Sequence, residues 1–509
     1  MTNIDGLIQG MFIVSLLTIL YGISIFLYLK KRIYPTLFLI VFSGFALRLF
    51  CSSNPMLHPW DERYHALVAK NIMEQPFEPK LYKYHVLDYD YRSWTANKVW
   101  LHKQPIPLWS MALSLKVFGV NEFSLRLPSV FLSTFCIYLT FCISLLLFGS
   151  DRVGLIAAFL HSINGLAIEL SSGKVATDHI DTFFLFFTEL SIFFVLLNAK
   201  NGKKVFMFVA GIACGAAILT KWLPALIIFP LYLAINAKNK NKRQLLTDLI
   251  ILSTTISLTA LPWQIYAQWL FPLEYQWEQH FNKLHFTEGL EGNGGAWWYF
   301  VDRIRINVNE MIYIILLWFF YDALQKENKA LKSENLFLLI YIAVPFLVFS
   351  IAKTKMPGYL LFTFPAYFII SGLFIERLVF SAHGVLRKTK FQKFNIFIVT
   401  VIFALAIRYG LERVKPFKTH EKEMLAKKEM MRTNFPPKSV VFNIPYPIEL
   451  MFYASCIAYP VIPDSSLINQ LYDKNYHLFI VDNDDLSNNV KKNSKIKKIK
   501  LPAVMSQNH

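Results

Sequence analysis

Long hydrophobic runs alternate with short polar connectors along most of this 509-residue chain. The runs are about 15 to 23 residues long, and about 20 apolar residues cross a bilayer as a helix. Helices are expected because lipid offers no hydrogen-bond partners to exposed backbone groups. Alternating strands of about ten residues, which a membrane barrel requires, are not the pattern. The sequence therefore predicts an all-α, multi-pass membrane protein.

We expect about twelve spans. They lie near residues 7–29, 34–50, 124–148, 153–171, 180–199, 205–220, 222–237, 247–265, 306–321, 336–352, 359–376 and 394–409. Within the sixth, Gly211 and Gly215 are four residues apart, a spacing that predicts close contact with another helix.

Composition and charge give the class of protein and its orientation. Hydrophobic residues make up 55% of the chain and charged residues only 17%, which excludes a soluble globular protein. The net charge of +18 is gathered in short connectors, at 30–32, 200–204, 238–243 and 387–393. That is the positive-inside pattern, so these connectors are predicted to be cytoplasmic. No nucleic-acid motif accompanies them, and nucleic acid is not an expected partner.

The N-terminal run is not a secretory signal peptide. It follows Asp5 and precedes a basic cluster, the reverse of a signal peptide's charge order. It is predicted to be an uncleaved helix with its N-terminus outside. Crossing at each run then places the loop 51–123 outside, and this loop holds two amphipathic segments, 63–73 and 107–119, suited to a membrane surface.

After residue 410 the pattern changes from long apolar runs to short strand-like and helix-like segments. "SVVFNI", "CIAYPVIP" and "YHLFIVD" resemble strands, and "PIELMFYA" and "SSLINQLYD" resemble helices between them. We therefore expect three domains: an extra N-terminal helix (1–33), a transmembrane domain (34–410) and a small extracytoplasmic α/β domain (411–509). The last has no glycine-rich phosphate loop.

Polar residues that suit one substrate class gather in the segments predicted to lie outside. Singly, each acid or lysine is ordinary for a solvated loop. Asp178 and Lys221 are harder to explain this way, because they lie in very short turns between apolar runs, where ionisable groups are costly. Together, lysines, carboxylates and aromatic residues suit a lipid-linked anionic substrate with a carboxylate base for an incoming hydroxyl.

Six motifs in order resemble the GT-C glycosyltransferases, and most of all protein O-mannosyltransferases and the aminoarabinose transferases that modify lipid A. They are "HPWDERYHALVAKNIM", "WLHKQPIPLW", "VFGVNEFSLRLPSV", "ATDHIDTFF", "LTKWLPALIIFP" and "KTKMPGYLLFTFPA". The resemblance covers about residues 34 to 376 and implies sugar transfer from a polyprenyl-phosphate donor outside the cytoplasmic (inner) membrane. The C-terminal domain would then face the periplasm.

The resemblance also implies a site. Asp61 matches the family's loop aspartate, the catalytic carboxylate, with Glu62 beside it and Asp178 as the second functional aspartate. The residues expected to bind the substrate or its phosphate are Arg63, Tyr64, Lys103, Lys221, His280, Lys283, Lys355 and Tyr359. Direct displacement at the anomeric carbon predicts inversion.

Two departures from the family pattern bear on this site. Many relatives have Glu-Lys-Pro-Pro where this chain has His102-Lys103-Gln104-Pro105, and that glutamate helps to hold a metal in some of them. No cofactor is therefore assigned, and a divalent ion bound by His102 and His280 together stays open. Trp222 stands where relatives have a glycine after the turn lysine.

Several readings stay open. The acceptor is a hydroxyl or phosphate on an envelope glycolipid such as lipid A or lipopolysaccharide, another glycan, or an exported protein. The sugar is a pentose, a hexose or an amino sugar. Besides donor and acceptor, the expected partners are membrane lipids. The rival classes are a lipid-linked sugar transporter or flippase, which would show repeated halves and mid-membrane charges, and a non-enzymatic scaffold.

Overall fold

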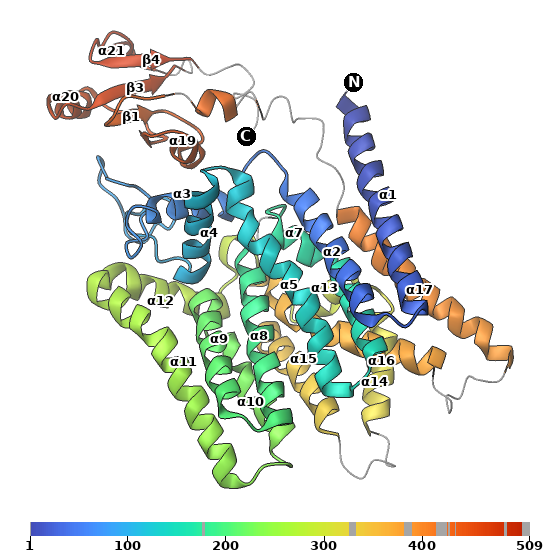
Figure 1. The fold of residues 1–509 in the computed structure, drawn as a ribbon. Helices are drawn as coiled ribbons and strands as arrows, with labels where there is room; N and C mark the ends of the chain where they lie inside the picture. Colours follow the sequence, from blue (N-terminus) through green and yellow to red (C-terminus); the bar gives the residue numbers. More distant parts are fainter. Residues whose placement is uncertain are drawn as a thin grey trace. The chain divides into compact units, whose positions relative to one another are not determined.

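The protein is described from a computed structural model, which covers residues 2–175, 179–324, 332–380, 389–413, 425, 428–432, 434–482 and 486–500. The chain forms two compact units. The first contains residues 1–6, 53–128 and 417–509, and the second contains 7–52 and 129–416. Figure 1 shows the helices of both units and the small sheet near the C-terminus.

Nine helices in the described part of the chain are long and apolar enough to cross a membrane, or up to eleven if each of two bent helix pairs is one span. The nine agree with nine of the twelve predicted spans. They include α1 (Thr2–Leu29), α2 (Ile33–Ser52), α5 (Glu122–Phe148), α8 (His179–Asn201), α9 (Lys204–Lys221), α11 (Lys242–Leu270), α15 (Ser333–Ile351), α16 (Phe364–Phe380) with the preceding 3₁₀ turn η3 (Pro357–Thr363), and α17 (Thr389–Arg413). The predicted class, a polytopic all-α membrane protein, is confirmed.

The other three predicted spans have a different form. Residues 153–171 fall on α6 (Asp151–Ser162) and α7 (Gly165–Ser171), bent by 53°. Residues 306–321 fall on α13 (Tyr299–Asn307) and α14 (Ile312–Leu324), bent by 107°. Residues 222–237 form η1 (Leu223–Ile227) and α10 (Ile228–Asn236), which together are too short to count as a span.

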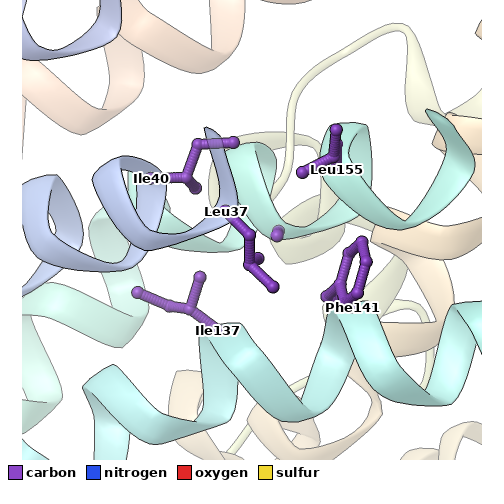
Figure 2. Close-up of a cluster of buried hydrophobic side chains, with 6 residues drawn as sticks. Leu37, Ile40, Ile137, Phe141 and Leu155 are labelled. Carbon is purple, nitrogen blue, oxygen red and sulfur yellow. The ribbon is translucent and has the colours of Figure 1, made fainter. Parts of the chain in front are cut away.

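Apolar side chains from distant segments form the core of the second unit. In Figure 2, Leu37 and Ile40 of α2 face Ile137 and Phe141 of α5 and Leu155 of α6, and all are nearly fully buried. Their interdigitation holds α2, α5 and α6 together by burial of apolar surface.

The pair Gly211 and Gly215 lies at a close helix crossing, as predicted. A Cβ atom on Gly211 would lie 1.6 Å from Oγ1 of Thr255 on α11, and one on Gly215 would lie 2.5 Å from Cβ of Thr259. Only glycine permits this approach, so α9 packs directly on the backbone of α11.

The first unit contains the loop 51–123 and the C-terminal domain. Both predicted amphipathic segments are helical, as α3 (Asp61–Ile72) and α4 (Pro105–Phe118), which pack on each other. The C-terminal residues form a parallel sheet in the order β2-β1-β3-β4, as expected for an α/β domain. Its elements are β1 (Ser439–Phe442), α19 (Pro447–Tyr453), β2 (Ile457–Ala458), α20 (Ser465–Asp473), β3 (His477–Val481), α21 (Asn488–Lys491) and β4 (Ile496–Ile499). The predicted domain boundaries stay a prediction.

Candidate functional site

Asp61 is the first residue of α3, where the positive end of the helix dipole favours a negative charge. Its Oδ2 atom accepts a hydrogen bond from Nζ of Lys103 at 3.3 Å. The two side chains are partly accessible, with exposed fractions of 13% for Asp61 and 25% for Lys103. A small ligand can therefore reach the pair. Both residues were predicted from the sequence as site residues.

The charge state of Asp61 follows from its neighbours. Burial opposes ionisation, but the ammonium of Lys103, helped by His65 and His102, outweighs burial and holds the pKa of Asp61 below its usual value. Asp61 is thus a carboxylate at neutral pH, as a proton acceptor must be.

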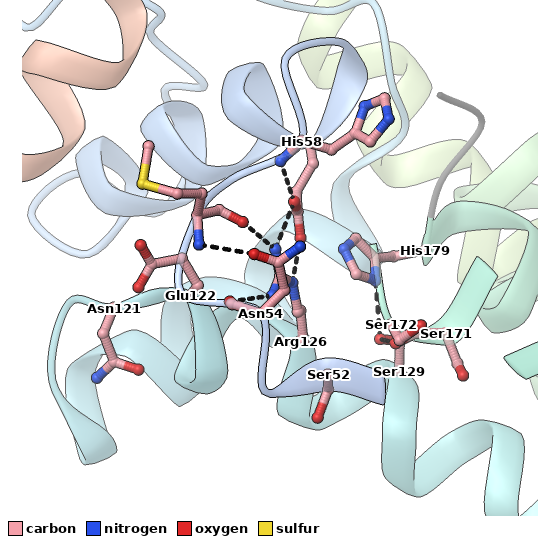
Figure 3. Close-up of polar contacts among 12 residues, drawn as sticks. Ser52, Asn54, His58, Asn121, Glu122, Arg126, Ser129, Ser171, Ser172 and His179 are labelled. Carbon is pink, nitrogen blue, oxygen red and sulfur yellow. Dashed lines mark hydrogen bonds and ion pairs between the residues drawn. The ribbon is translucent and has the colours of Figure 1, made fainter. Parts of the chain in front are cut away.

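Glu62 has a different environment from its neighbour. It is 1% exposed, and its two oxygens accept from Nε and Nη2 of Arg126 at 2.6 and 2.9 Å. The backbone N–H of His58 also donates to it at 2.6 Å. Arg126 in turn donates to the carbonyls of Asn54 and Met56, and Figure 3 shows this network around the labelled His58, Asn54 and Arg126. The network fixes the loop that precedes α3.

Arg63 and Tyr64 connect α3 to the C-terminal domain and to the rest of the loop. Nη1 of Arg63 lies 3.0 Å from Oε1 of Glu449 on α19, and its guanidinium lies over the ring of Tyr64. Tyr64 is buried against Trp94. Both predicted binding residues thus have structural contacts within the first unit.

His102 lies flat against Trp94, with ring centroids 4.7 Å apart and an angle of 10° between the rings. A metal would need several ligands around this histidine. No group of three His, Cys, Asp or Glu side chains in the described part of the chain is placed to hold one. His280, the other predicted metal ligand, is exposed on α12 (Pro272–Thr287) beside Trp277. The described residues therefore form no metal site.

A second polar cluster in the other unit surrounds Lys221 at the C-terminal end of α9. Nζ of Lys221 forms an ion pair with Oδ1 of Asp181 and lies 4.5 Å from the centroid of the Tyr359 ring. Asp181 is buried, and Lys221 is 24% exposed. Lys221 and Tyr359 are therefore neighbours, as the sequence motifs implied, and Asp181 joins them.

Gly358 is part of this cluster because it has no side chain. A Cβ atom there would lie 2.2 Å from Oδ2 of Asp181, so any other residue would displace the aspartate. Trp222, which follows Lys221, has φ of 65° and ψ of −149°, a conformation that favours glycine. Glycine would adopt this backbone angle without strain.

Lys355 is another predicted residue of the second unit, in the loop 353–356 that follows α15. The ammonium of Lys355 donates to the carbonyls of Phe349, Ser350 and Ala352, at the end of α15. These contacts make Lys355 a helix cap. Lys283 is exposed on α12, beyond His280.

Asp178 lies outside the described residues. Its neighbour His179 begins α8, and Nδ1 of His179 is 2.9 Å from Oγ of Ser129, which donates to the carbonyl of Ser171 at 2.7 Å. Figure 3 shows His179, Ser129 and Ser171 together.

The comparisons with known proteins agree with this fold. The profile described as dolichyl-phosphate-mannose-protein mannosyltransferase matches residues 102–266, about a third of the chain. An undecaprenyl phosphate-alpha-4-amino-4-deoxy-L-arabinose arabinosyl transferase of Pseudomonas savastanoi pv. phaseolicola is 24% identical over 277 residues, which are 52% of this chain and 49% of the relative. An uncharacterized protein of Aquifex aeolicus is 27% identical over 285 residues, 55% of this chain and 54% of the relative. The chain thus matches about half the length of these curated relatives.

Two solved structures have the same fold over most of the chain. ArnT from Cupriavidus metallidurans bound to undecaprenyl phosphate superposes with a TM-score of 0.59 at 15% identity, covering 86% of this chain and 87% of ArnT. The archaeal oligosaccharyltransferase AglB from Archaeoglobus fulgidus, in complex with an inhibitory peptide and a dolichol-phosphate, superposes with a TM-score of 0.54 at 12% identity, covering 83% and 64%. The predicted resemblance to GT-C glycosyltransferases and the GT-C fold class are confirmed.

Proposed function

We propose that the chain is a membrane glycosyltransferase that moves a sugar from a polyprenyl-phosphate donor to a hydroxyl or phosphate on an envelope glycolipid or other glycan. The main support is the accessible Asp61–Lys103 pair at the start of α3, a carboxylate and an ammonium held together in the loop motif that resembles the family's catalytic loop. Relatives named as undecaprenyl phosphate aminoarabinose transferases, and an ArnT structure holding undecaprenyl phosphate, favour this donor class.

The lysines are suited to the change of charge in this reaction. A donor phosphodiester has one negative charge, and the departing polyprenyl phosphate gains a second as the bond to the sugar breaks. Cations placed at the leaving oxygen stabilise the transition state more than the bound donor. Lys103 is paired with Asp61, and in our proposal the donor phosphate takes over its ammonium group. The role of Lys221 rests on the resemblance.

Asp61 would act as the general base. It takes the proton of the acceptor hydroxyl as that oxygen bonds to the anomeric carbon, and the electrons of the broken bond go to the departing phosphate oxygen. When Lys103 turns to the phosphate, Asp61 loses its main counter-charge, so its pKa rises and it becomes a stronger base. Attack from the face opposite the phosphate inverts the sugar.

The other predicted residues have supporting roles in this proposal. Glu62 and Arg63 hold α3 in place through Arg126 and Glu449. Tyr359 and Asp181 position the ammonium of Lys221. Asp178, His280 and Lys283 are proposed to contact acceptor or donor on the resemblance alone.

We also propose that the site faces outward from the cytoplasmic membrane. The basic connectors 30–32, 200–204, 238–243 and 387–393 support a cytoplasmic side opposite the loop 51–123.

The test compares membranes containing wild type, Asp61→Asn and the control Asp88→Asn, which changes an exposed acid in the same loop. Each receives a panel of radiolabelled polyprenyl-phosphate pentoses, hexoses and amino sugars, and label is followed into lipid, glycan and protein fractions. We expect transfer by wild type and control and a loss of about 10²-fold or more in Asp61→Asn. Equal transfer by Asp61→Asn would remove Asp61 as the base, and label in protein would favour an O-mannosyltransferase-like enzyme.

A further inference from the structure

Three aromatic rings of the loop 51–123 pack in a row. The rings of Trp94 and His102 are stacked, with centroids 4.7 Å apart and an angle of 10° between their planes. Trp60 meets Trp94 edge to face, with centroids 6.5 Å apart and an angle of 75°. These three residues form an aromatic wall within the first unit.

The aromatic wall lies beside the Asp61–Lys103 pair. Trp60 directly precedes Asp61 in the chain, and His102 directly precedes Lys103. Burial raises the pKa of Asp61, and Lys103, His65 and His102 together lower it, so the His102 ring is close to this carboxylate. Since Lys103 donates to Asp61 at 3.3 Å, the wall, the carboxylate and the ammonium share one small region.

Two buried residues hold the wall in place. Trp100 is fully buried, and its Nε1 donates to the carbonyl of Trp94 at 2.7 Å while its ring meets His102 at a centroid distance of 5.6 Å. Tyr64 packs edge to face on Trp94, at 4.9 Å. A surface that is ordered before a ligand arrives loses little conformational freedom on binding. The wall is therefore preorganised for a ligand.

Trp60 presents the accessible part of this wall. Its side chain is 40% exposed, and the neighbouring Asp61 and Lys103 are also partly accessible. Exposed tryptophans of membrane proteins are often anchors at the lipid interface. Trp60 differs from a simple anchor because its ring packs on the wall next to a carboxylate and an ammonium. This combination suits a ligand with an apolar face and polar edges.

A sugar ring has this form. Its hydroxyl groups lie around the rim, and its C–H groups carry a small positive charge that is attracted to the negative face of an aromatic ring. In a polyprenyl-phosphate donor the sugar is joined directly to the phosphate. A phosphate at Lys103 therefore brings the sugar close to His102 and its neighbours in the wall.

We propose that the aromatic wall binds the sugar ring of the donor, with Trp60 stacked on its C–H face while Lys103 holds the phosphate. The proposal rests on the proposed function for the identity of the donor. It gives a role to His102, which stands where many relatives have a glutamate. A sugar with an axial hydroxyl on the stacked face fits less closely, so Trp60 also selects among donors.

The test measures binding to the full-length chain in detergent. The variants are Trp60→Leu and Trp60→Phe, and the matched control is Trp269→Leu, at an exposed tryptophan near the end of α11. The probes are the polyprenyl-phosphate sugar that wild type binds most tightly and bare polyprenyl phosphate. We expect Trp60→Leu to bind the sugar-bearing lipid about tenfold more weakly. It should bind the bare lipid as wild type does, which also shows that the variant is folded.

Trp60→Phe should keep part of the sugar-dependent binding, because it keeps an aromatic face, and Trp269→Leu should bind both lipids normally. In transfer assays Trp60→Leu should raise KM for the donor and leave KM for the acceptor unchanged. An equal loss for both lipids, no loss for either, or a raised KM for the acceptor alone would each overturn the assignment.

This inference and the proposed function fail in different ways. Sugar transfer by wild type, together with equal binding of the sugar-bearing lipid by wild type and Trp60→Leu, would overturn the wall and leave the proposed function standing. A loss of sugar-dependent binding in Trp60→Leu, with no transfer from any donor by wild type, would support the wall and count against the proposed function. Wild type that binds none of the sugar-bearing lipids would overturn both.

Discussion

Two adjacent carboxylates of α3, Asp61 and Glu62, have different surroundings and therefore different roles. Asp61 is partly exposed beside one lysine, whereas Glu62 is buried with both oxygens bound to Arg126. A carboxylate with accessible oxygen can exchange protons with a substrate, and one enclosed by a guanidinium cannot do so without breaking its pair. The motif "WDER" therefore combines one reactive and one structural acid.

Glu62→Gln should destabilise the protein strongly. Removing the charge leaves the buried guanidinium of Arg126 uncompensated, which costs about 3 kcal/mol. Thermal unfolding in detergent should show a clear drop in Tm relative to Glu74→Gln, whose pair with Lys83 is exposed and contributes less than about 1 kcal/mol. Equal Tm values for the two variants would contradict the structural role of Glu62.

Lys103→Met should change the pH dependence of transfer. A general base works only when deprotonated, so kcat/KM falls as pH drops through the pKa of Asp61 in the free enzyme. Lys103 lowers that pKa against the effect of burial, so its removal raises the pKa. The acid limb of kcat/KM should therefore move to higher pH. The control Lys80→Met, at a loop ion pair with Glu78, should leave the profile unmoved. An unchanged acid limb in Lys103→Met would show that another group controls it.

Gly358→Ala should disturb the Lys221 cluster. The added methyl group overlaps Oδ2 of Asp181, so the aspartate must move and the ammonium of Lys221 loses its position beside Tyr359. We expect transfer to fall about tenfold or more, with a raised KM for the donor. Gly22→Ala on α1, where a Cβ atom meets nothing within 4 Å, is the control and should keep wild-type kinetics. Normal kinetics in Gly358→Ala would separate this cluster from donor binding.

Sequence motifs located several of these residues but not their partners. Lys103, Lys221 and Tyr359 were predicted, and the structure pairs Lys103 with Asp61 and Lys221 with Tyr359. Asp181 was not among the predicted site residues, although an acid inside the apolar run "HIDTFF" is costly to bury unless it is paired. The ion pairs of Glu62 with Arg126 and Arg63 with Glu449 join residues 64 and 386 positions apart, which local patterns cannot reveal.

At the scale of helices and strands, the hydropathy of the sequence predicted where the helices lie better than it predicted where they bend. All twelve apolar runs form helices. The bends within 153–171 and 306–321 depend on tertiary packing, so the hydropathy of the sequence does not reveal them. Strand β4 was missed because "IKKI" lies in a lysine-rich tail that resembles a solvated segment. Residues 496–499 form a strand because they pair in parallel with β3, a distant contact that their own sequence does not indicate.

Gly211→Ala tests the contact between α9 and α11. The new Cβ atom would overlap Oγ1 of Thr255, and helices forced apart lose packing worth about 1 to 3 kcal/mol. Thermal unfolding should show the loss, and adding Thr255→Ala should restore part of it by removing the obstructing hydroxyl. Failure of the second substitution to restore any stability would mean that the contact is not at Thr255.

For the whole molecule, the division into two units changes how the C-terminal domain is understood. Residues 53–128 and 417–509 are far apart in sequence but belong to one compact unit. Contacts of Arg63 and Lys70 with α19 join them. The sequence predicted a small α/β domain after residue 410, and in the structure its helix α19 packs on α3, the helix that begins at Asp61.

The orientation of the whole chain can be measured with single cysteines. The five native cysteines are free, and four of them are buried, so the wild type should react weakly with a membrane-impermeant maleimide. The basic connectors predict that Asn239 is cytoplasmic and that Asp88, in the loop 51–123, is outside. Asp88→Cys should therefore be labelled in cells whose outer barrier admits the reagent but whose cytoplasmic membrane is intact. Asn239→Cys should be labelled only after detergent opens that membrane. The reverse pattern would place Asp61 on the cytoplasmic side and would require a donor presented from the inner leaflet.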